Sequence, residues 1–94
     1  MGCKMAMNTR ELEKIFKALA NRQRLAILKY LKKNKEASVG EISREIKLSY
    51  KATSQHLIIL AGVDIIERDQ RSLEAYYRLS KDQNEVVSRT LSML

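Results

Sequence analysis

Residues 38–60 read SVGEISREIKLSYKATSQHLIIL, and this stretch decides the fold. Ser38 and Glu41 form a capping box, in which each side chain bonds the backbone amide of the other residue. A short helix therefore begins here, and we expect it to end near Ile46. About three residues later, Ser49 is placed to cap a second helix. The stretch predicts two short helices joined by a tight turn.

Apolar residues at helical spacing indicate which side of each helix faces inward. They are Val39, Ile42 and Ile46 in the first helix, and Ala52, Leu57 and Leu60 in the second, which we expect to run to about Ala61. The second helix is polar on its other side near its start. This arrangement is a helix-turn-helix.

Two longer helices are predicted before this pair. Asn8 and Glu11 form a capping pair, and apolar residues follow at helical spacing, so the first helix covers about residues 9–20. Asn21 is placed to cap the second helix. Several lysines lie near the end of that helix, where cations suit the negative end of the helix dipole.

From Ile65 the pattern changes to that of strands. A polar segment, residues 67–72, is followed by apolar residues at the alternate positions 73, 75, 77 and 79. This predicts a two-stranded hairpin with Tyr77 on the core side.

A last helix is predicted near residues 80–94, because Ser80 and Gln83 form a capping pair and apolar residues follow. The expected fold is mainly α with a small β-hairpin, in the order α-α-α-α-β-β-α. A chain of 94 residues with 45% hydrophobic residues suits one core, so we expect a single domain over residues 1–94. So short a chain leaves much apolar surface near solvent, which favours a partner.

The chain is strongly basic, with a net charge of +7 and a pI near 9.8. Residues 1–48 carry 12 basic and five acidic side chains, whereas the rest of the chain is balanced. This excess favours a polyanionic partner, either nucleic acid or an acidic membrane surface.

The composition also indicates the cellular compartment in which the protein works. One cysteine, Cys3, permits neither a disulfide framework nor an all-cysteine metal site within one chain. No run of about 18 apolar residues is present to span a bilayer, and residues 1–10 lack the apolar core of a secretory signal. We therefore expect a cytoplasmic protein without a membrane segment.

Three stretches resemble one known family. Residues 15–28, IFKALANRQRLAIL, are similar to LFKALADPTRLRIL, a common form of the opening helices in ArsR-type (ArsR/SmtB) repressors. Residues 48–57, LSYKATSQHL, resemble the recognition-helix pattern LSQSTVSRHL of that family. Residues 75–79, AYYRL, resemble its wing strand VYYRL. The three occur in the order in which the family has them.

The resemblance implies a winged helix-turn-helix transcriptional regulator, a repressor that acts as a homodimer at a palindromic operator in double-stranded DNA. The helices near 9–20 and 80–94 would form the dimer contact. The helix after Ser49 would enter the major groove, where polar side chains near its start reach base edges. The candidates for DNA contact are Ser49, Tyr50, Lys51, Thr53, Ser54, Gln55 and His56 on this helix, and Arg68, Gln70 and Arg71 on the wing.

Side-chain chemistry divides the roles within this set. The Gln55 amide can hydrogen-bond adenine, whereas Ser49, Lys51 and Thr53 suit phosphates.

Acidic residues weaken the expected wing contact. Asp64, Glu67 and Asp69 oppose DNA phosphates, so the wing depends on its arginines and on Gln70. Asp64 and Ser72 also stand where the family often has turn glycines, and we expect the end of the helix before Asp64 to be rebuilt locally.

Metal-sensing members of the family carry a Cys-Val-Cys-Asp run where this chain has Ser38-Val39-Gly40-Glu41, and the thiols are missing. A second family site uses Asp and His on the last helix, but residues 81–94 contain no histidine. We expect no metal and no cofactor. The signal that controls the protein is left open. The alternatives are a small molecule, a redox change, a partner protein or no effector at all.

Several residues keep two interpretations. A lone histidine such as His56 is more often structural than a ligand, although the resemblance favours DNA contact. Cys3 is either an inert thiol or a site of cross-linking between two chains on oxidation. Ile58, where the family usually has a polar residue, is either exposed or covered by another subunit.

The alternative function is a winged-helix protein-interaction module without specific DNA readout, in which Ile58 and the neutral recognition surface bind another protein. Catalysis is the weakest interpretation, and we expect no enzyme. The chain has no glycine-rich phosphate loop, and no carboxylate lies three or four residues from His56 to orient it.

Overall fold

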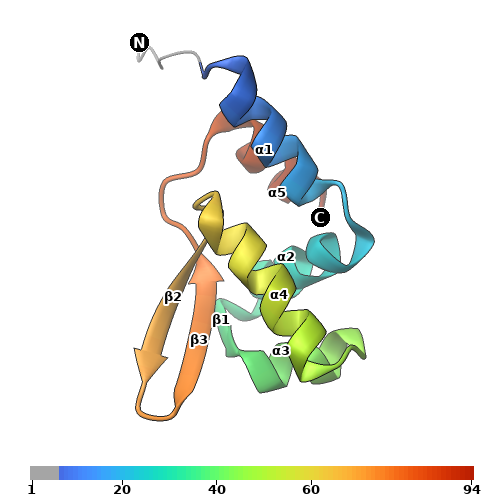
Figure 1. Ribbon diagram of the computed structural model, residues 1–94, viewed down its shortest axis with the longest axis vertical. Helices are drawn as coiled ribbons and strands as arrows, with labels where there is room; N and C mark the ends of the chain where they lie inside the picture. Colours follow the sequence, from blue (N-terminus) through green and yellow to red (C-terminus); the bar gives the residue numbers. More distant parts are fainter. Residues whose placement is uncertain (1–6) are drawn as a thin grey trace.

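The structure, a computed structural model that describes residues 7–94, is a helical body with a small sheet along one side (Figure 1). The helices are α1 (Thr9–Leu19), α2 (Arg22–Asn34), α3 (Val39–Ile46), α4 (Tyr50–Gly62) and α5 (Glu85–Met93). The strands are β1 (Glu36–Ser38), β2 (Ile66–Arg71) and β3 (Glu74–Leu79). The molecule is 40 Å long, with α1 and α5 at one end of its long axis and the β2–β3 turn at the other (Figure 1).

Side-chain caps set the starts of the first four helices, as the sequence predicts. Asn8 Oδ1 accepts from the Glu11 amide at 2.8 Å, and Asn21 Oδ1 accepts from two amides of α2. Both arms of the capping box of α3 are present. The Ser49 hydroxyl accepts from the amide of Ala52 at 3.1 Å. These local signals fix the boundaries because the chain has no proline to break a helix.

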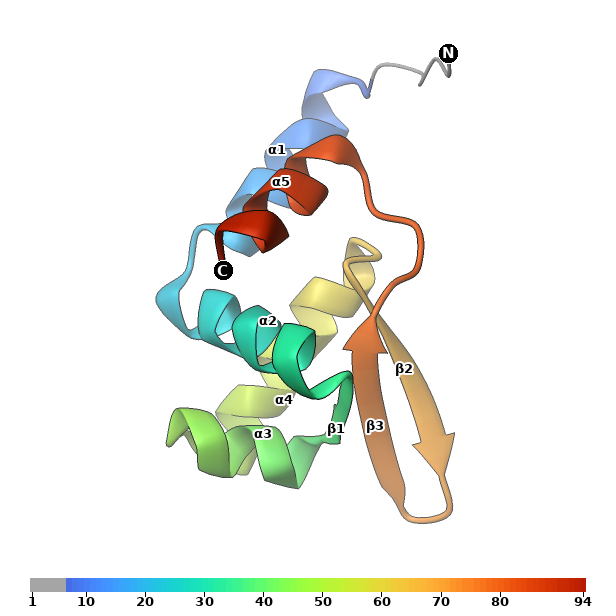
Figure 2. The same cartoon turned by 180° about the vertical axis from the view of Figure 1, so that it is seen from behind.

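The sheet has three strands rather than the predicted two. Strand β1 pairs antiparallel with β3, placing Ala37 opposite Tyr77, and the strand order is β1-β3-β2. Figure 2 shows β1 between the end of α2 and the start of α3, beside β3. The order is therefore α-α-β-α-α-β-β-α. The prediction missed β1 because three residues are too few to show alternation.

The last helix begins at Glu85, so the prediction of a start near residue 80 is wrong. Asn84 is the N-cap and accepts from the amide of Val87 at 2.9 Å. The Gln83 amide donates instead to the carbonyl oxygens of Ser80 and Ile65, at 2.9 Å each. Residues 80–84 are thus a connection held against the start of the sheet, and α5 is shorter than predicted.

The core lies between the helices and the inner face of the sheet. Its fully buried side chains come from four helices and the chain before β2: Ile27, Leu28, Leu31, Ile42, Leu57, Leu60, Ile65 and Val87. Tyr77 is buried from the sheet, as predicted, whereas Leu73 at the hairpin turn is almost fully exposed. Within residues 7–94, every helix is too short or too polar to span a bilayer.

Two turns have left-handed backbone where the resemblance places glycine. Asp64, with φ of 62°, closes the end of α4, and its amide donates to the carbonyl of Ala61. Ser72, with φ of 55°, makes the β2–β3 turn. Aspartate tolerates this conformation better than most residues, so the end of α4 keeps the left-handed backbone that favours glycine.

Candidate nucleic-acid interface

Helix α4 buries one side and presents the other to solvent. Thr53, Leu57 and Leu60 on the inner side have no exposed surface. Lys51, Gln55 and Ile58, spaced four and three residues apart, form an exposed stripe on the outer side. We call these three residues the outer stripe of α4.

The structure brings most of the predicted contact residues of α4 to its solvent side. Ser49 and Tyr50 are exposed at its start, followed by Lys51 and Gln55 of the outer stripe. Ser54 and His56 are half-buried at the two edges of the stripe. None of these residues is fully buried.

Thr53 is the exception, and the prediction that it contacts phosphate is wrong. It lies on the same side of α4 as Leu57 and Leu60, and its side chain is completely buried. Its hydroxyl oxygen has no hydrogen-bond partner among the described residues. Its helical position therefore directs Thr53 into the core.

His56 is held by Arg24, a residue that the sequence analysis did not single out. Nη1 of Arg24 lies 3.1 Å from Nδ1 of His56. Nε and Nη2 of Arg24 donate to the carbonyls of Ala18 and Lys17 in the last turn of α1. Burial and the positive charge of Arg24 lower the pKa of His56 below its ordinary value. Arg24 lies within the stretch that resembles the family, but no sequence signal pairs it with a residue 32 positions later.

The two arginines of β2 have different partners. Arg71 makes a bidentate pair with Glu36, at 2.8 and 2.9 Å, and its Nε donates to Asp69 at 2.9 Å. Its guanidinium also lies 4.6 Å from the centre of the Tyr76 ring. The hydrogen bond from Arg71 lowers the pKa of the Glu36 carboxyl, and the two carboxylates raise the pKa of Arg71. Arg71 therefore joins β1 to β2.

Arg68 lies on the opposite face of the hairpin. Arg68 is opposite Tyr77, and Gln70 is opposite Ala75, so both lie on the face of the sheet that packs against the helices. Arg68 donates to the Gln70 side chain, which in turn donates to the carbonyl of Ser72 at 3.2 Å. Among the described residues no carboxylate forms an ion pair with Arg68, so its charge is not neutralised.

Two further cations flank the turn between α3 and α4. Arg44 and Lys47 are both exposed, and Lys47 ends α3 in the left-handed conformation with φ of 57°. In residues 7–94 neither forms an ion pair. The sequence analysis overlooked both residues, although the concentration of basic residues in the first half of the chain pointed to them.

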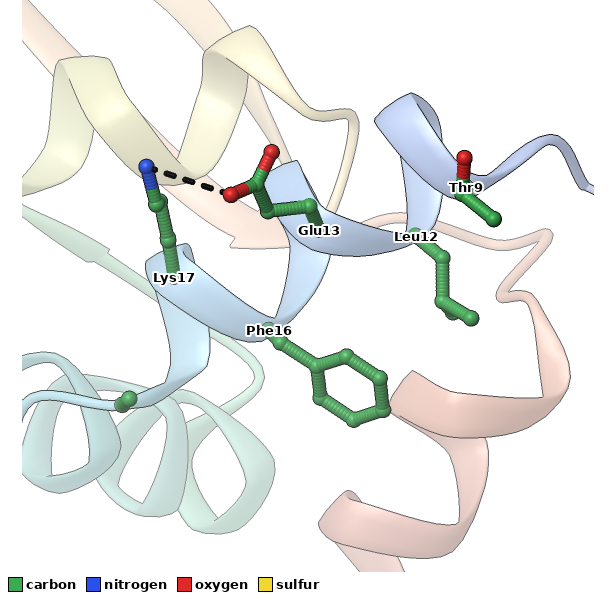
Figure 3. A pocket seen from close by; sticks show the side chains of 6 residues that line it. Thr9, Leu12, Glu13, Phe16 and Lys17 are labelled. Carbon is green, nitrogen blue, oxygen red and sulfur yellow. Dashed lines mark ion pairs between the residues drawn. The ribbon is translucent and has the colours of Figure 1, made fainter.

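An apolar groove lies on α1, at the other end of the molecule. It has a volume of about 430 Å³ and is lined by Thr9, Leu12, Glu13, Phe16, Lys17 and Ala20. Figure 3 shows Leu12 and Phe16 pointing to one side of α1, while an ion pair joins Glu13 and Lys17 on another. Half of the Phe16 surface is exposed, and Met93 of α5 is exposed as well. We call this surface the α1 groove.

The sequence profile described as bacterial regulatory protein, arsR family, matches residues 21–68, just over half of the chain. The chain belongs to the arsR family. The match begins at the cap of α2 and ends within β2, so it contains the whole helix-turn-helix.

Individual relatives of the chain are transcriptional regulators. The transcriptional activator HlyU of Vibrio cholerae serotype O1 is 36% identical over 95 positions, which cover 94% of this chain and 87% of HlyU. The transcriptional repressor PagR of Bacillus anthracis is 29% identical, with coverage of 92% and 86%. These two arsR-family relatives act in opposite directions on transcription.

Solved structures confirm the fold. HlyU from Vibrio cholerae N16961 matches with a TM-score of 0.77 at 32% identity, covering 95% of this chain and 92% of HlyU. The homodimeric winged helix-turn-helix DNA-binding domain of Mb0332 from Mycobacterium bovis matches with a TM-score of 0.74 at 25% identity, covering 96% and 85%. The predicted winged helix-turn-helix is thus confirmed, with α3 and α4 as its two helices and β2–β3 as its wing.

Proposed function

We propose that this chain is a cytoplasmic transcriptional regulator that binds double-stranded DNA as a homodimer and represses transcription at a palindromic operator. The observation that carries the proposal is the division of α4 between a buried apolar side and an exposed polar one. A helix fits the major groove, and its free side then faces the base edges. The arsR-family match and the similarity to the DNA-binding domain of Mb0332 support a DNA-binding role.

Helix α4 supplies the sequence readout. Gln55, in the middle of the outer stripe, makes a bidentate contact with adenine, while Tyr50 and Ser54 contact neighbouring bases. Ser49 and Lys51 bind phosphates at the start of the helix. The Ser49 hydroxyl accepts one hydrogen bond, and its proton, which has no acceptor in the described part of the chain, can be donated to a phosphate oxygen.

Residues around α4 supply most of the electrostatic attraction. The helix itself carries only Lys51 as a charged side chain. Arg44 and Lys47 flank its start, and Arg68 lies on the wing face toward the helices. Each unpaired cation that neutralises a phosphate releases a counterion, which adds affinity for any duplex. Arg71 supports the sheet instead, because two carboxylates already hold its guanidinium.

The homodimer forms through the α1 groove together with α5. Phe16 is half exposed on α1 beside the half-buried Leu12, and Met93 of α5 is exposed as well. A second copy related by a two-fold axis covers the same surface on both chains. Two copies of α4 then enter successive major grooves, about 34 Å apart along the duplex. The homodimeric Mb0332 domain supports this arrangement.

The first experiment measures binding to a random 30-base-pair duplex by fluorescence anisotropy over a series of salt concentrations. We expect micromolar binding at low salt that weakens steeply as salt rises, because several phosphate contacts release counterions. Absent or salt-insensitive binding contradicts the proposal.

The second experiment selects a preferred duplex from a randomised library and compares wild type with Gln55→Ala. We expect the variant to lose about 1 to 3 kcal/mol on the selected duplex and to bind random DNA unchanged, because a bidentate base contact discriminates between sequences. Equal loss on both duplexes shows that Gln55 contacts only the backbone.

A protein-interaction module is the second candidate, and the exposure of Ile58 favours it. Ile58 is 64% exposed in the outer stripe, and Ile59 beside it is 43% exposed. Apolar residues at the centre of a recognition surface suit a protein partner. Ile58→Lys discriminates the two functions: added charge strengthens binding to random duplex if α4 faces DNA, and has no such effect if α4 faces a protein.

A further inference from the structure

The side chain of Arg24 joins three helices. It projects from the first turn of α2. Its Nε donates to the carbonyl of Ala18 at 2.6 Å, and its Nη2 donates to that of Lys17 at 3.1 Å, both in the last turn of α1. Its Nη1 lies 3.1 Å from Nδ1 of His56 on α4. One residue thus links the end of the proposed dimer helix to the proposed DNA-reading helix.

The bond between Arg24 and His56 fixes the state of the imidazole. A guanidinium has only donors and stays charged, so Nδ1 of His56 must accept and cannot carry a proton. The ring is therefore neutral, with its proton on Nε2. Protonation of His56 places a second positive charge beside Arg24, and burial and the charge of Arg24 both disfavour that form, which lowers the pKa of His56. Arg24 is the charged group that faces His56 in the described part of the chain.

The place of His56 on α4 indicates what its free N–H can reach. Successive residues of a helix are about 100° apart, so His56 lies beside the outer stripe rather than within it. It is half-buried next to α2. When the outer stripe faces the floor of the major groove, the side of the helix that carries His56 faces the wall of the groove, which is lined by phosphates.

We propose that Arg24 is a positioning residue that holds His56 as a neutral Nε2–H donor to a DNA phosphate oxygen and ties this donor to the end of α1. The inference rests on the proposed DNA binding of α4. The inference adds to that function a phosphate contact from a neutral side chain. It also adds a physical link between the dimer helix and the recognition helix.

A purely structural role for Arg24 makes different predictions. In that case Arg24 only satisfies the two carbonyls at the end of α1, and His56 packs beside it without touching DNA. Arg24→Ala would then lower stability, but the DNA affinity of the folded variant would not depend on His56. Two measurements distinguish the positioning role from the purely structural one. They are the protonation state of His56 and the dependence of the effect of Arg24→Ala on DNA affinity on the presence of His56.

The first measurement uses the free protein. His56 is the only histidine, so the ¹⁵N signals of imidazole in NMR report on it alone. We expect the Nε2–H tautomer and a pKa below the ordinary value in wild type. In Arg24→Ala we expect a mixture of tautomers and a pKa nearer the ordinary value. Arg24→Lys, which keeps a charged donor, should restore part of the shift.

The matched control is Arg22→Ala. Arg22 lies two residues earlier in α2 and is exposed, and its side chain makes no hydrogen bond or ion pair within residues 7–94. This variant should leave the tautomer and the pKa of His56 unchanged. A wild-type proton on Nδ1, or a pKa at or above the ordinary value, overturns the positioning role.

The second measurement is a double-mutant cycle on random 30-base-pair duplex at low salt. We expect His56→Ala to weaken binding about tenfold or more, since it loses one hydrogen bond to a charged group. Arg24→Ala should weaken binding by a smaller factor, because the imidazole of His56 is still present but is no longer held in one orientation as the Nε2–H donor. The double variant should be no weaker than His56→Ala, because Arg24 acts only through that contact. His56→Ala should leave the salt dependence of binding unchanged, because a neutral donor releases no counterion.

Additive losses in the cycle, or a weaker salt dependence in His56→Ala, overturn the proposed donor. Unfolding curves of each variant show whether it is folded at the assay temperature, and Arg24→Lys replaces Arg24→Ala in the cycle if the alanine variant is not. Wild-type protein that binds no duplex overturns the phosphate contact together with the proposed function. The tautomer measurement does not use DNA, so it still decides whether Arg24 positions His56.

Discussion

The two arginines of β2 show how neighbouring charges change the role of a residue. Arg71 and Arg68 were equivalent candidates from sequence, since both precede the wing turn. In the structure, Glu36 from β1 and Asp69 neutralise Arg71, whereas the side chain of Arg68 bonds, among residues 7–94, the neutral side chain of Gln70. The partner from β1 could not be foreseen, because it lies 35 residues earlier in the chain.

This difference predicts the salt dependence of DNA binding. Arg68→Ala should reduce the slope of log affinity against log salt by about one, because one phosphate contact is lost. Arg71→Ala, its matched control on the same strand, should change the slope little, since that cation is already paired. Anisotropy titrations at four salt concentrations give both slopes. Equal slopes for the two variants contradict the assignment.

Thr53 is a second residue whose environment decides its role. Its hydroxyl is buried without a hydrogen-bond partner among the described residues, which costs stability. Thr53→Val removes the hydroxyl and keeps the shape, so the free energy of unfolding should rise by about 1 kcal/mol with DNA affinity unchanged.

Thr90→Val in α5 is the control for Thr53→Val, since the Thr90 hydroxyl donates to the carbonyl of Val86 at 2.8 Å. That variant should gain no stability. Urea unfolding measures both. Loss of DNA affinity in Thr53→Val would restore the phosphate contact that burial argues against.

At the scale of helices and strands, local signals predicted the structure well, and long-range ones were missed. The caps of α1 to α4 depend on residues within three positions of each other, so the sequence contains all the information. Strand β1 forms only because β3 pairs with it, about forty residues later. The start of α5 shifted because Gln83 bonds a carbonyl at the start of the sheet rather than closing a capping box.

The same limit applied to the candidate site. The outer stripe of α4 could be predicted from helical spacing and resemblance, because both are read directly from consecutive residues. Thr53 was assigned to phosphate on side-chain chemistry alone, although its spacing from Leu57 and Leu60 already placed it inside. The link between Arg24 and His56 could not be predicted, because it depends on how α2 packs against α4.

The start of α5 gives a prediction for the stability of an element. Asn84→Ala removes the observed cap and should lower the free energy of unfolding by about 1 kcal/mol. Ser80→Ala tests the cap expected from sequence and should cost much less, since its side chain caps no amide of α5. Urea unfolding of the two variants compares them directly. A larger loss in Ser80→Ala would show that the helix begins earlier in solution.

At the scale of the whole molecule, the α1 groove and the wing tip lie at opposite ends of a 40 Å body, with α4 between them (Figure 1). A two-fold dimer built on the groove therefore leaves both copies of α4 accessible. The separation lets one surface be changed without touching the other.

Phe16→Glu tests the dimer, because Phe16 lies in the α1 groove and away from the proposed DNA contacts. The charge placed in the apolar contact should produce a monomer in sedimentation velocity, because it cannot be buried in the interface. Affinity for a selected palindromic duplex should fall by orders of magnitude, although no DNA contact has changed. Leu73→Glu is the control, because it also replaces an exposed apolar residue by glutamate, but on the hairpin turn. This variant should leave the dimer intact. A dimeric Phe16→Glu variant contradicts the assigned interface.

The most direct test of DNA recognition by α4 is a map of backbone amide shifts in NMR as a selected duplex is added to labelled protein. We predict that the largest changes lie at Ser49 to Ile58 and at Arg68 and Gln70 on the wing, with α1 and α5 little affected. Changes concentrated on α1 and α5, with α4 unmoved, would contradict the account.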